Sequence, residues 1–523
     1  MSNFVDLEKL RSDEKLYGVT TSTAIPGEVI VKRGKFLQKC VDFMNRMGGE
    51  ERGIERVLPE EKTDQKPFDN FSVWYDPPKN PLCRWLTRTF RTSANLTVST
   101  FALGSLGPGL FFMGWWDSFL TILFFNLLGM IAPAYMATFG PLTGLRTITF
   151  TRYSFGWYGA MFLAIVNIIS CVGWSMVNSI AGGQIIYSIS DGKCPLALGV
   201  ILIAIVSLLV ALFGYKIIHV YERYSWILMI IMFALVAGLG GHAFADIPMP
   251  TGSGELSSVL SFGAAVFGFA VAWSSLTMDY NVNMRAEVGK WPVFSWTYLG
   301  LFVSLNFIEW LGAAAMTATV VNEDWANAYA EAGIGGLLWM CVQQSGGFGK
   351  FVLVVLAFSI VANNVPNNYS LGLCAQVLGN WAIAIPRFIW TFIGVLVYVI
   401  AAVAGRDHFA SILDSFLLCM GYWITPYALI VFMEHHLFAR GRYNLDTWND
   451  KRGLPLGLAA FSTWACSLVM AVMGMSQEWY VGPLALLAGG APYGADIGIE
   501  LSVGICLLLY PPLRYIEKKK FGL

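Results

Sequence analysis

The apolar stretch from Thr97 to Trp116, TVSTFALGSLGPGLFFMGWW, constrains the fold of this chain more than any other feature. About 20 apolar residues are enough for a helix to span the roughly 30 Å hydrocarbon core of a bilayer. Three glycines and a proline within Gly104–Gly109 interrupt the stretch and disfavour a regular helix there. Non-helical backbone is tolerated at membrane depth where it lines a cavity or is buried in protein, and in transporters it points to the binding site.

A second interrupted segment runs from Val259 to Thr277 and carries Ala272-Trp273-Ser274-Ser275 toward its cytoplasmic end. The two segments occupy corresponding places in the membrane region, so we expect a binding site between them. The alternative is that these glycines and the proline, which are common in membrane helices, only pack one helix against another.

The composition is that of a polytopic membrane protein. Of the 523 residues, 56% are hydrophobic and 13% charged, and the mean hydropathy is +0.58. Lys and Arg together number 34, as do Asp and Glu, so no charge excess favours nucleic-acid binding. The nine cysteines form no CxxC pair and are interpreted as small apolar residues, and we expect neither a metal nor a cofactor. Residues 1–30 are polar and charged, so no cleavable signal peptide is expected.

The chain is expected to be an all-α membrane protein with a hydrophilic tail at residues 1–94, cytosolic and partly disordered. Part of this tail, Gly53–Glu61, is less tail-like and either docks on the helices or makes a looser amphipathic surface contact. Twelve apolar spans follow the tail, at residues 96–116, 118–139, 158–188, 195–214, 223–244, 258–278, 293–320, 350–377, 385–404, 409–433, 455–475 and 495–513.

The spans divide into an expected core and two additional helices. Breaks in the first and sixth spans predict two sets of five helices with inverted topology, the arrangement in which a substrate sits at the repeat interface near the midplane. The expected domains are a ten-helix transport core at 95–433 with repeats at 95–244 and 258–433, a linker with helices 11 and 12 at 434–513, and a cytosolic tail at 514–523.

The distribution of basic residues sets the orientation, because cytoplasmic loops carry an excess of Lys and Arg. The expected inner segments hold Arg146, Arg152, Lys216, Arg223, Arg285, Lys290, Arg387, Arg440, Arg442, Lys451, Arg452, Arg514, Lys518, Lys519 and Lys520. The expected outer loops hold Lys193, Lys350 and Arg406. We therefore expect both termini to lie in the cytosol.

Trp174 and Asn178 stand four residues apart in the third span, on one helix face. A flat indole beside an amide that both donates and accepts suits a planar heterocycle, because aromatic faces stack and an amide pairs with ring edges. Trp273, at the second break, is placed to close the other side of the sandwich. The alternative is that these side chains hydrogen-bond neighbouring helices and bind nothing.

The eighth span contains four asparagines around a proline, Asn363-Asn364-Val365-Pro366-Asn367-Asn368. Polar groups at membrane depth are costly and are functional candidates by default. All four cannot face one cavity, so some must connect helices. We expect Asn364 and Asn367 to belong to the site and leave open which asparagine binds.

Three carboxylates are candidates for proton coupling or gating: Glu309 in the seventh span, Asp414 in the tenth and Glu222 at the inner end of the fifth. A buried carboxylate can exchange a proton as access alternates. Glu222, with Lys216 and Arg223 nearby, can equally form a structural ion pair. Asp279, just beyond the sixth span, belongs either to a gate or to a helix end.

Several motifs together resemble the fungal purine-cytosine permeases, within the nucleobase-cation symporters of the five-plus-five inverted-repeat fold. The resemblance covers nearly the whole chain from about residue 50 and is carried by GIERVLPEEKTD, NLTVSTFALGSLGPGLF, VGWSMVNS, GYKIIHVYERYSW, AWSSLTMDYNVN and ANNVPNNYS. It implies proton-coupled uptake of cytosine, adenine, guanine and hypoxanthine across the plasma membrane, with 5-fluorocytosine using the same route.

The resemblance also implies roles for individual residues. Trp174 and Trp273 would stack on the base and Asn178 would read its edge, while Ser99 would supply a contact from the first span and Asn364 or Asn367 one from the eighth. Sodium-coupled relatives use first-span carbonyls and eighth-span hydroxyls; here Ser359 has no adjacent Ser or Thr, which favours proton coupling.

The expected partners are a planar nucleobase, a proton and the lipid bilayer, and the oligomeric state is left open. The same branch includes vitamin B6 permeases, so pyridoxine is an alternative substrate. A nutrient receptor that barely transports would share the pocket, whereas a channel fits a closed midplane pocket less well. A membrane enzyme fits least, because the chain has no P-loop, no HExxH and no identifiable catalytic cysteine.

Overall fold

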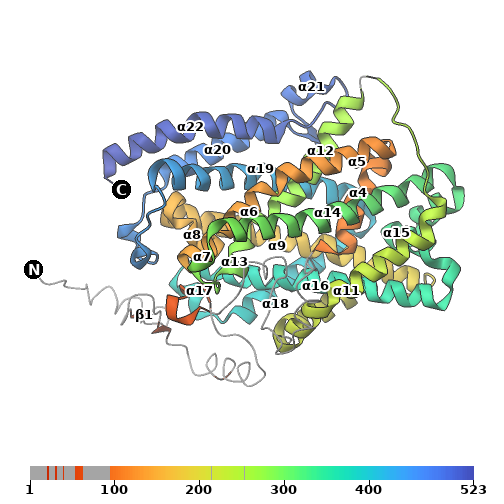
Figure 1. Ribbon diagram of the computed structural model, residues 1–523, viewed down its shortest axis with the longest axis horizontal. Helices are drawn as coiled ribbons and strands as arrows, with labels where there is room; N and C mark the ends of the chain where they lie inside the picture. The colour runs from red at the N-terminus through yellow and green to blue at the C-terminus, as the bar shows by residue number, and fades with distance from the viewer. Residues whose placement is uncertain are drawn as a thin grey trace, which may run out of the picture.

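The computed structural model describes residues 21–22, 30–31, 39, 53–62, 95–213, 215–252 and 254–522, without the side chains of 21–22, 30–31, 213, 215–225 and 380. Helices dominate this part of the chain (Figure 1). The strands form two short antiparallel pairs, β1 (Thr21–Ser22) with β2 (Ile30–Val31) and β3 (Ser476–Gln477) with β4 (Tyr480–Val481).

The helices of the first half are α4 (Val98–Leu110), α5 (Trp115–Gly129), α6 (Ile131–Ala137), α7 (Phe139–Thr143), α8 (Thr147–Phe150), α9 (Arg152–Ile189), α10 (Leu196–Phe213) and α11 (Tyr215–Gly240). Those of the second half are α12 (Gly254–Ala272), α13 (Thr277–Asn281), α14 (Lys290–Val321), α15 (Glu323–Val342), α16 (Gly347–Val377), α17 (Asn380–Ala384), α18 (Arg387–Gly405) and α19 (Phe409–Met433). The chain continues with a π-helical turn (Glu434–Phe438), α20 (Leu458–Gly474), α21 (Pro483–Gly489) and α22 (Gly498–Phe521). Single turns of 3₁₀ helix are η1 (Pro59–Glu61), η4 (Gly241–Ala243), η5 (Trp273–Ser275), η6 (Ala286–Val288), η7 (Gln343–Ser345), η8 (Arg406–His408), η10 (Leu445–Thr447) and η11 (Lys451–Gly453).

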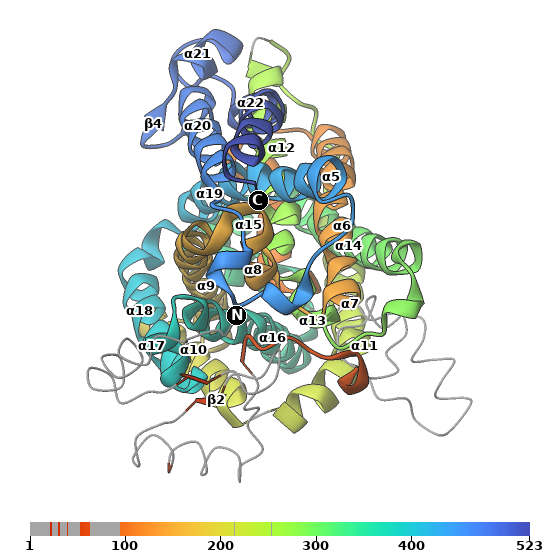
Figure 2. The ribbon, with the colours of Figure 1, turned by 90° about the vertical axis from the view of Figure 1, so that its left-hand side faces the viewer.

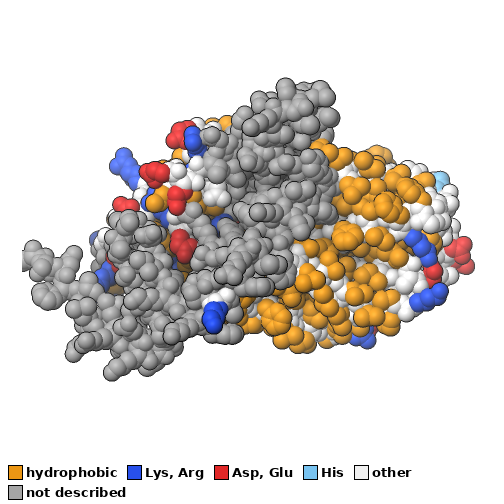
Figure 3. All heavy atoms as spheres, turned by 90° about the horizontal axis from the view of Figure 1, so that it is seen from below, with side chains coloured by type: hydrophobic (Ala, Val, Ile, Leu, Met, Phe, Trp, Pro, Cys, Tyr) orange, Lys and Arg blue, Asp and Glu red, His pale blue; other side chains and the backbone are white. Residues whose placement is uncertain are grey.

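The long helices have the length and apolarity of membrane spans. Eight helical stretches in the described ranges meet this requirement, and α10 and α20 are shorter apolar helices. Where Figure 3 shows described atoms, apolar side chains cover the middle of the visible face and charged ones gather toward its ends. Such an apolar band between charged ends is the surface a bilayer requires, and the expected all-α, multi-span fold class is confirmed.

The core packs around α9 and α16, with α10 and α15 also against α9 and with α4 against α14. The additional helices α20 and α22 pack on each other and on α19, at one edge of the core (Figures 1 and 2). α7, α8, α13 and the end of α22 lie at the left end of Figure 1, and α15 lies toward the right end.

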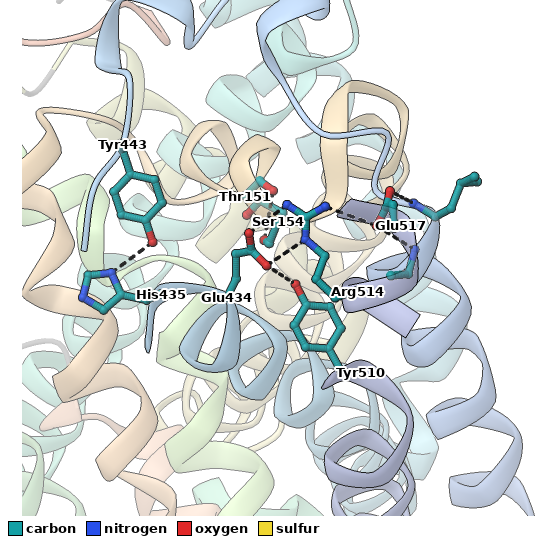
Figure 4. Close-up of polar contacts among 10 residues, drawn as sticks. Thr151, Ser154, Glu434, His435, Tyr443, Tyr510, Arg514 and Glu517 are labelled. Atoms are coloured by element: carbon teal, nitrogen blue, oxygen red, sulfur yellow. Dashed lines mark hydrogen bonds and ion pairs between the residues drawn. The ribbon is translucent and has the colours of Figure 1, made fainter. Parts of the chain in front are cut away.

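A buried ion-pair cluster attaches α22 to the core (Figure 4). Arg514 donates from Nε and Nη2 to the two carboxylate oxygens of Glu434, at 3.0 and 2.9 Å, and Tyr510 donates its hydroxyl to the same carboxylate at 2.6 Å. Glu517 accepts hydrogen bonds from the first backbone N–H groups of α20, at Leu458 and Ala459. The residues expected to begin a cytosolic tail at 514 therefore continue α22 as far as Phe521.

The first interruption does not lie where the glycines and proline predicted it. α4 runs continuously through Gly104–Gly109, begins with Thr97 as its cap and ends at Leu110. The non-helical backbone lies at residues 111–114, where Phe112 has a φ of 52°. Gly104 serves close packing instead: a Cβ there would lie 1.9 Å from the backbone oxygen of Glu309 on α14. Pro108 stands near the carboxyl end of α4. The backbone hydrogen bond that proline cannot donate is missing there, but only the last residues of the helix follow it.

The second interruption lies at the expected residues. α12 ends at Ala272, the 3₁₀ turn η5 covers Trp273–Ser275, and the chain becomes helical again in α13 after Leu276, whose φ is −128°. This change of helix type turns Trp273 and its neighbours away from the line of α12.

One long helix was not expected. The segment that follows α14 forms α15, which bends at Gly333, where φ is 56°. A Cβ at Gly333 would come within 2.5 Å of the side chain of Gln184 on α9, so the bend needs a glycine both for its backbone angle and for its contact.

The part of the tail at residues 53–62 docks on the helices. Ile54 and Val57 are each 1% exposed, and the Val57 N–H donates to the Gly144 oxygen at 2.8 Å. Lys62 donates its ammonium to the Pro141 oxygen at 2.6 Å. Burial lowers the pKa of Lys62, and the nearby Arg56 guanidinium lowers it further. These contacts hold the segment against the loops around α7.

Candidate functional site

A small hollow lies at the second interruption, where the residues just before α4 meet α9, α12 and α16. Its lining residues are Asn95, Trp174, Phe269, Ala272, Trp273, Leu276, Asn363 and Asn367. The walls thus combine two indoles, three amides and an apolar surface. Pockets for small molecules are typically apolar with a few placed polar groups, and this hollow follows that rule.

Trp273 enters the wall from the 3₁₀ turn that interrupts the sixth span. Its indole Nε1 donates to the Asn95 side-chain oxygen at 3.0 Å, which fixes the ring relative to the start of α4. The interruption therefore presents an aromatic ring whose only polar group is already bonded.

Trp174 enters the wall from α9 and is held by two phenylalanines. The rings of Phe269 on α12 and Phe416 on α19 each meet it edge to face, with centroids 5.0 Å away and interplanar angles of 87° and 86°. Edge-to-face packing restricts the tilt of the indole. The sequence offered no signal for either phenylalanine, because both are ordinary apolar residues within spans.

Asn178, one turn beyond Trp174, is fully buried and joins three elements. It accepts a hydrogen bond from the Ser99 hydroxyl of α4. Its Nδ2 donates to the side-chain oxygens of Asn363 at 2.7 Å and Asn364 at 2.9 Å, both on α16. Asn178 therefore forms a layer behind the wall that orients other amides.

The asparagines of α16 divide between the hollow and this layer. Asn363 and Asn367 line the hollow on one helix face, and the Asn367 amide donates to the Asn363 backbone oxygen at 3.1 Å. Asn364 is fully buried and donates toward the hydroxyls of Ser179 and Ser207, at 3.4 and 3.3 Å. Of the residues expected in the site, Trp174, Trp273 and Asn367 line the hollow, while Ser99, Asn178 and Asn364 lie behind it.

Two of the three carboxylates expected to couple protons, Glu309 and Asp414, lie outside this wall. Glu309 of α14 is fully buried on the side of α5, where the Asn126 amide donates to its carboxylate at 2.7 Å. Asp414 of α19 is 9% exposed. Glu222 falls in α11, where its side chain is outside the described part. Within the described ranges no three His, Cys, Asp or Glu side chains group as metal ligands.

Asp279 connects helices at the end of the interrupted span. Its carboxylate accepts hydrogen bonds from the Thr147 N–H at 2.8 Å, the Thr147 hydroxyl at 3.1 Å and the Ser370 hydroxyl at 3.2 Å. Burial raises the pKa of Asp279, while the nearby Arg146 guanidinium acts in the opposite direction. The contacts join α13 to the amino end of α8 and to α16.

Comparison with known proteins identifies the family. Residues 84–496 match the family model of permeases for cytosine/purines, uracil, thiamine and allantoin. The chain is 40% identical over 504 residues to the purine-cytosine permease fcyB of Emericella nidulans, covering 95% of each chain. The chain belongs to the fungal purine-cytosine permease family. The permease is thus a transporter and not an enzyme, as expected.

Other relatives include both purine-cytosine permeases and a vitamin B6 transporter. The permease is 33% identical over 489 residues to the purine-cytosine permease FCY2 of Saccharomyces cerevisiae, covering 92% of this chain and 88% of the relative. It is 31% identical over 548 residues to the vitamin B6 transporter TPN1 of Saccharomyces cerevisiae, covering 94% of this chain and 91% of the relative.

A solved structure confirms the architecture of the permease. Mhp1, a nucleobase-cation-symport-1 family transporter in a closed conformation with bromovinylhydantoin bound, superposes with a TM-score of 0.66 at 13% identity. The match covers 90% of this chain and 96% of Mhp1. The permease therefore has the expected transporter fold.

Proposed function

We propose that the permease imports cytosine and the purines adenine, guanine and hypoxanthine with protons across the plasma membrane, by alternating access. The observation that carries the proposal is the hollow itself, in which two tryptophans and two asparagines of α16 meet beside an interrupted helix. A nucleobase presents a flat face and mixed donor and acceptor edges. The tryptophans suit the face and the amides suit the edges.

In the proposed binding mode, the residues of the wall contact the base and the residues behind the wall hold them in position. Trp174 and Trp273 contact the faces of the base, and Asn363 and Asn367 pair with its edge. Asn178, Ser99 and Asn364 hold the amides in position from behind. An unpaired buried polar group costs about 1–3 kcal/mol, while stacking adds about 0.5–1.5 kcal/mol beyond area burial, so the amides set the specificity.

Closure is proposed to occur by rocking of one helix bundle against the other around this hollow. The wall supports this view because it takes Asn95, just before α4, and residues of α12 and η5 on one side and residues of α9 and α16 on the other. A bundle movement would change the spacing between the two tryptophans and so open or close the site.

Both termini are proposed to be cytosolic. The loops around α7, α8 and α13, which carry Arg146, Arg152 and Arg285, lie at the same end of the molecule as the end of α22 (Figure 1). α15, with Glu323, Asp324 and Glu331, lies toward the other end. This distribution supports an inner side at the left of Figure 1.

Vitamin B6 is the second candidate substrate, because the vitamin B6 transporter TPN1 is 31% identical to this chain. The higher identity of 40% to fcyB favours the nucleobases. Pyridoxine would also require partners for two hydroxymethyl groups in place of an exocyclic amine. A receptor with little transport would bind the same ligands without filling the cell.

The test is uptake of radiolabelled cytosine into cells that lack their own permeases, at acidic and neutral pH, with adenine, uracil and pyridoxine as competitors. We expect concentrative uptake that is greater at acidic pH and is blocked by adenine but not by uracil or pyridoxine. Pyridoxine transport without cytosine uptake would move the protein to the vitamin branch, and binding without accumulation would make it a receptor.

A matched pair of asparagine variants links uptake to the hollow. N363A removes an amide from the wall, whereas N322A removes one that caps α15 by accepting from the Asp324 N–H at 2.9 Å, away from the hollow. We expect N363A to lose most uptake and N322A to keep it. Equal uptake by the two variants would contradict the proposed site.

A further inference from the structure

Glu309 occupies a site that is unusual for a carboxylate. It stands near the middle of α14, is 0% exposed, and packs against the backbone of α4 at Gly104. Its hydrogen-bonding side chain is Asn126 of α5, which is also 0% exposed. A buried ionised carboxylate requires a cation or several donors, because desolvation of the charge is costly.

The hydrogen bonds of this pair are incomplete in one specific way. The Asn126 amide nitrogen donates to Oε2 of Glu309 at 2.7 Å. The remaining oxygen of each side chain, Oδ1 of Asn126 and Oε1 of Glu309, is buried without a hydrogen-bond partner among the described residues. Both are acceptors if Glu309 is ionised, so neither can satisfy the other.

A single proton on Glu309 would give both of these oxygens a hydrogen-bond partner. A carboxylic acid and a primary amide can form two hydrogen bonds in a ring, in which the amide N–H donates to one acid oxygen and the acid O–H donates to the amide oxygen. We propose that Glu309 is protonated in this conformation and is the site at which the permease binds its coupling proton. The proton joins Oε1 and is donated toward Asn126 Oδ1, and release of the proton leaves the carboxylate.

On α5 and α6, the titratable residues stand well away from Asn126 along the chain. α4 carries none; α5 carries Asp117, nine residues before Asn126; α6 carries Tyr135, nine residues after it. At 1.5 Å per residue, nine helical residues span about 14 Å. The others are Lys290 and Tyr298 on α14 itself, Glu323, Asp324, Tyr329, Glu331 and Cys341 on α15, His242 of η4, and Tyr215, Lys216, His219, Tyr221, Glu222, Arg223 and Tyr224 of α11.

The site can communicate with the hollow through α4. Gly104 meets the Glu309 backbone, and a Cβ at Gly312 would lie 1.9 Å from the Phe101 oxygen, so α4 and α14 touch backbone to backbone. Ser99, five residues before Gly104, points to Asn178 on the substrate side. Loss of the proton would leave an unpaired charge beside Asn126 of α5, on the residue whose backbone packs on α4, and would favour a movement of α14 relative to α5. This coupling rests on the proposed function, whereas the protonation of Glu309 does not.

The direct test is infrared difference spectroscopy of purified full-length permease without substrate. We expect a carbonyl band of a protonated carboxyl group at neutral pH that is present in the wild type and in D414N and missing from E309Q. In N126L the acid loses its amide acceptor, and we expect the same band to move to higher frequency. Identical wild-type and E309Q spectra, or a band unmoved by N126L, would overturn the proposal, and either variant alone suffices if the other does not fold.

The transport test separates coupling from protonation. Because glutamine keeps the shape of the protonated acid but cannot release a proton, we expect E309Q to retain substrate exchange and to lose concentrative uptake and its pH dependence. E478Q, which changes an exposed carboxylate in the turn between β3 and β4, is the matched control and should keep both. Concentrative uptake by E309Q would overturn the coupling role. If the wild type transported no nucleobase, the proposed function would be refuted instead. The infrared test of Glu309 protonation would still stand.

Discussion

The Asn178 side-chain nitrogen lies 2.7 Å from the side-chain oxygen of Asn363, and this contact connects the support layer on α9 to the wall of the hollow on α16. The same nitrogen also donates to Asn364. One buried amide thereby orients both neighbours, and it cannot itself pair with a ligand through that nitrogen without giving up one of them.

Replacement of Asn178 by Ala should impair transport of every base. The change removes the acceptor of the Ser99 hydroxyl and the donor to the side-chain oxygens of Asn363 and Asn364, and a buried polar group that becomes unsatisfied costs roughly 1–3 kcal/mol. At about 1.4 kcal/mol per factor of ten, we expect at least a tenfold loss of uptake. The measurement is initial uptake normalised to surface protein, and unchanged uptake of all bases would remove Asn178 from the site.

Asn367 and Asn364 should respond differently although they are one turn apart. N367A removes a wall amide and should change the order in which bases compete, while the fold is kept. N364A removes a buried amide that accepts from Asn178 and faces Ser179 and Ser207, and it should lower thermal stability instead. Competition assays and melting of the purified variants measure the two effects. A re-ranking by N364A with normal stability would reverse this assignment.

The bond between Trp273 and Asn95 can be isolated with a double-mutant cycle. W273F keeps an aromatic ring but removes the donor to the Asn95 oxygen, and N95A removes the acceptor. A net hydrogen bond is worth about 0.5–1.5 kcal/mol, so each variant should weaken binding two- to tenfold. The double variant should be little worse than either single one. Additive losses in equilibrium binding would show that the two side chains act independently.

Asp496, near the carboxyl end of α20 and the amino end of α22, should make stability depend on pH. Burial raises its pKa from an ordinary 3.8 to about 6, although the Ser476 and Gly498 N–H groups and the Tyr422 hydroxyl bond the carboxylate. The folded state therefore holds the proton more tightly than the unfolded state. Its stabilising contribution is complete below about pH 4 and is lost as the pH rises through 6.

The measurement is the melting temperature of the wild type minus that of D496N, followed over this pH range. We expect this difference to fall as the pH rises from about 4 through 6 and then to level off. A difference that rises over the same interval would mean that folding lowers the pKa of Asp496. S502A, which alters a buried hydroxyl of α22, serves as the control and should show no such slope.

Much of the functional architecture was accessible from the sequence because it depends on local patterns. Apolar length predicts spans, and α12 ends beside Trp273 as the change of pattern there indicated. The four-residue spacing of Trp174 and Asn178 placed both toward one region of the fold, since helix periodicity depends on position along the chain alone. The family motifs led to the same fold and family that the comparisons establish.

Other features were decided by tertiary packing. The chain contains four adjacent asparagines, and only the rotation of α16 against α9 puts Asn363 and Asn367 in the wall and Asn364 behind it. Gly104 reads as a helix breaker, but α4 stays helical because the glycine admits the backbone of α14. The pairing of Asn126 with Glu309 joins residues 183 positions apart. The sequence by itself determined which segments enter the membrane, whereas contacts between distant helices decided which polar groups meet there, because burial and hydrogen bonding are set by neighbours in space.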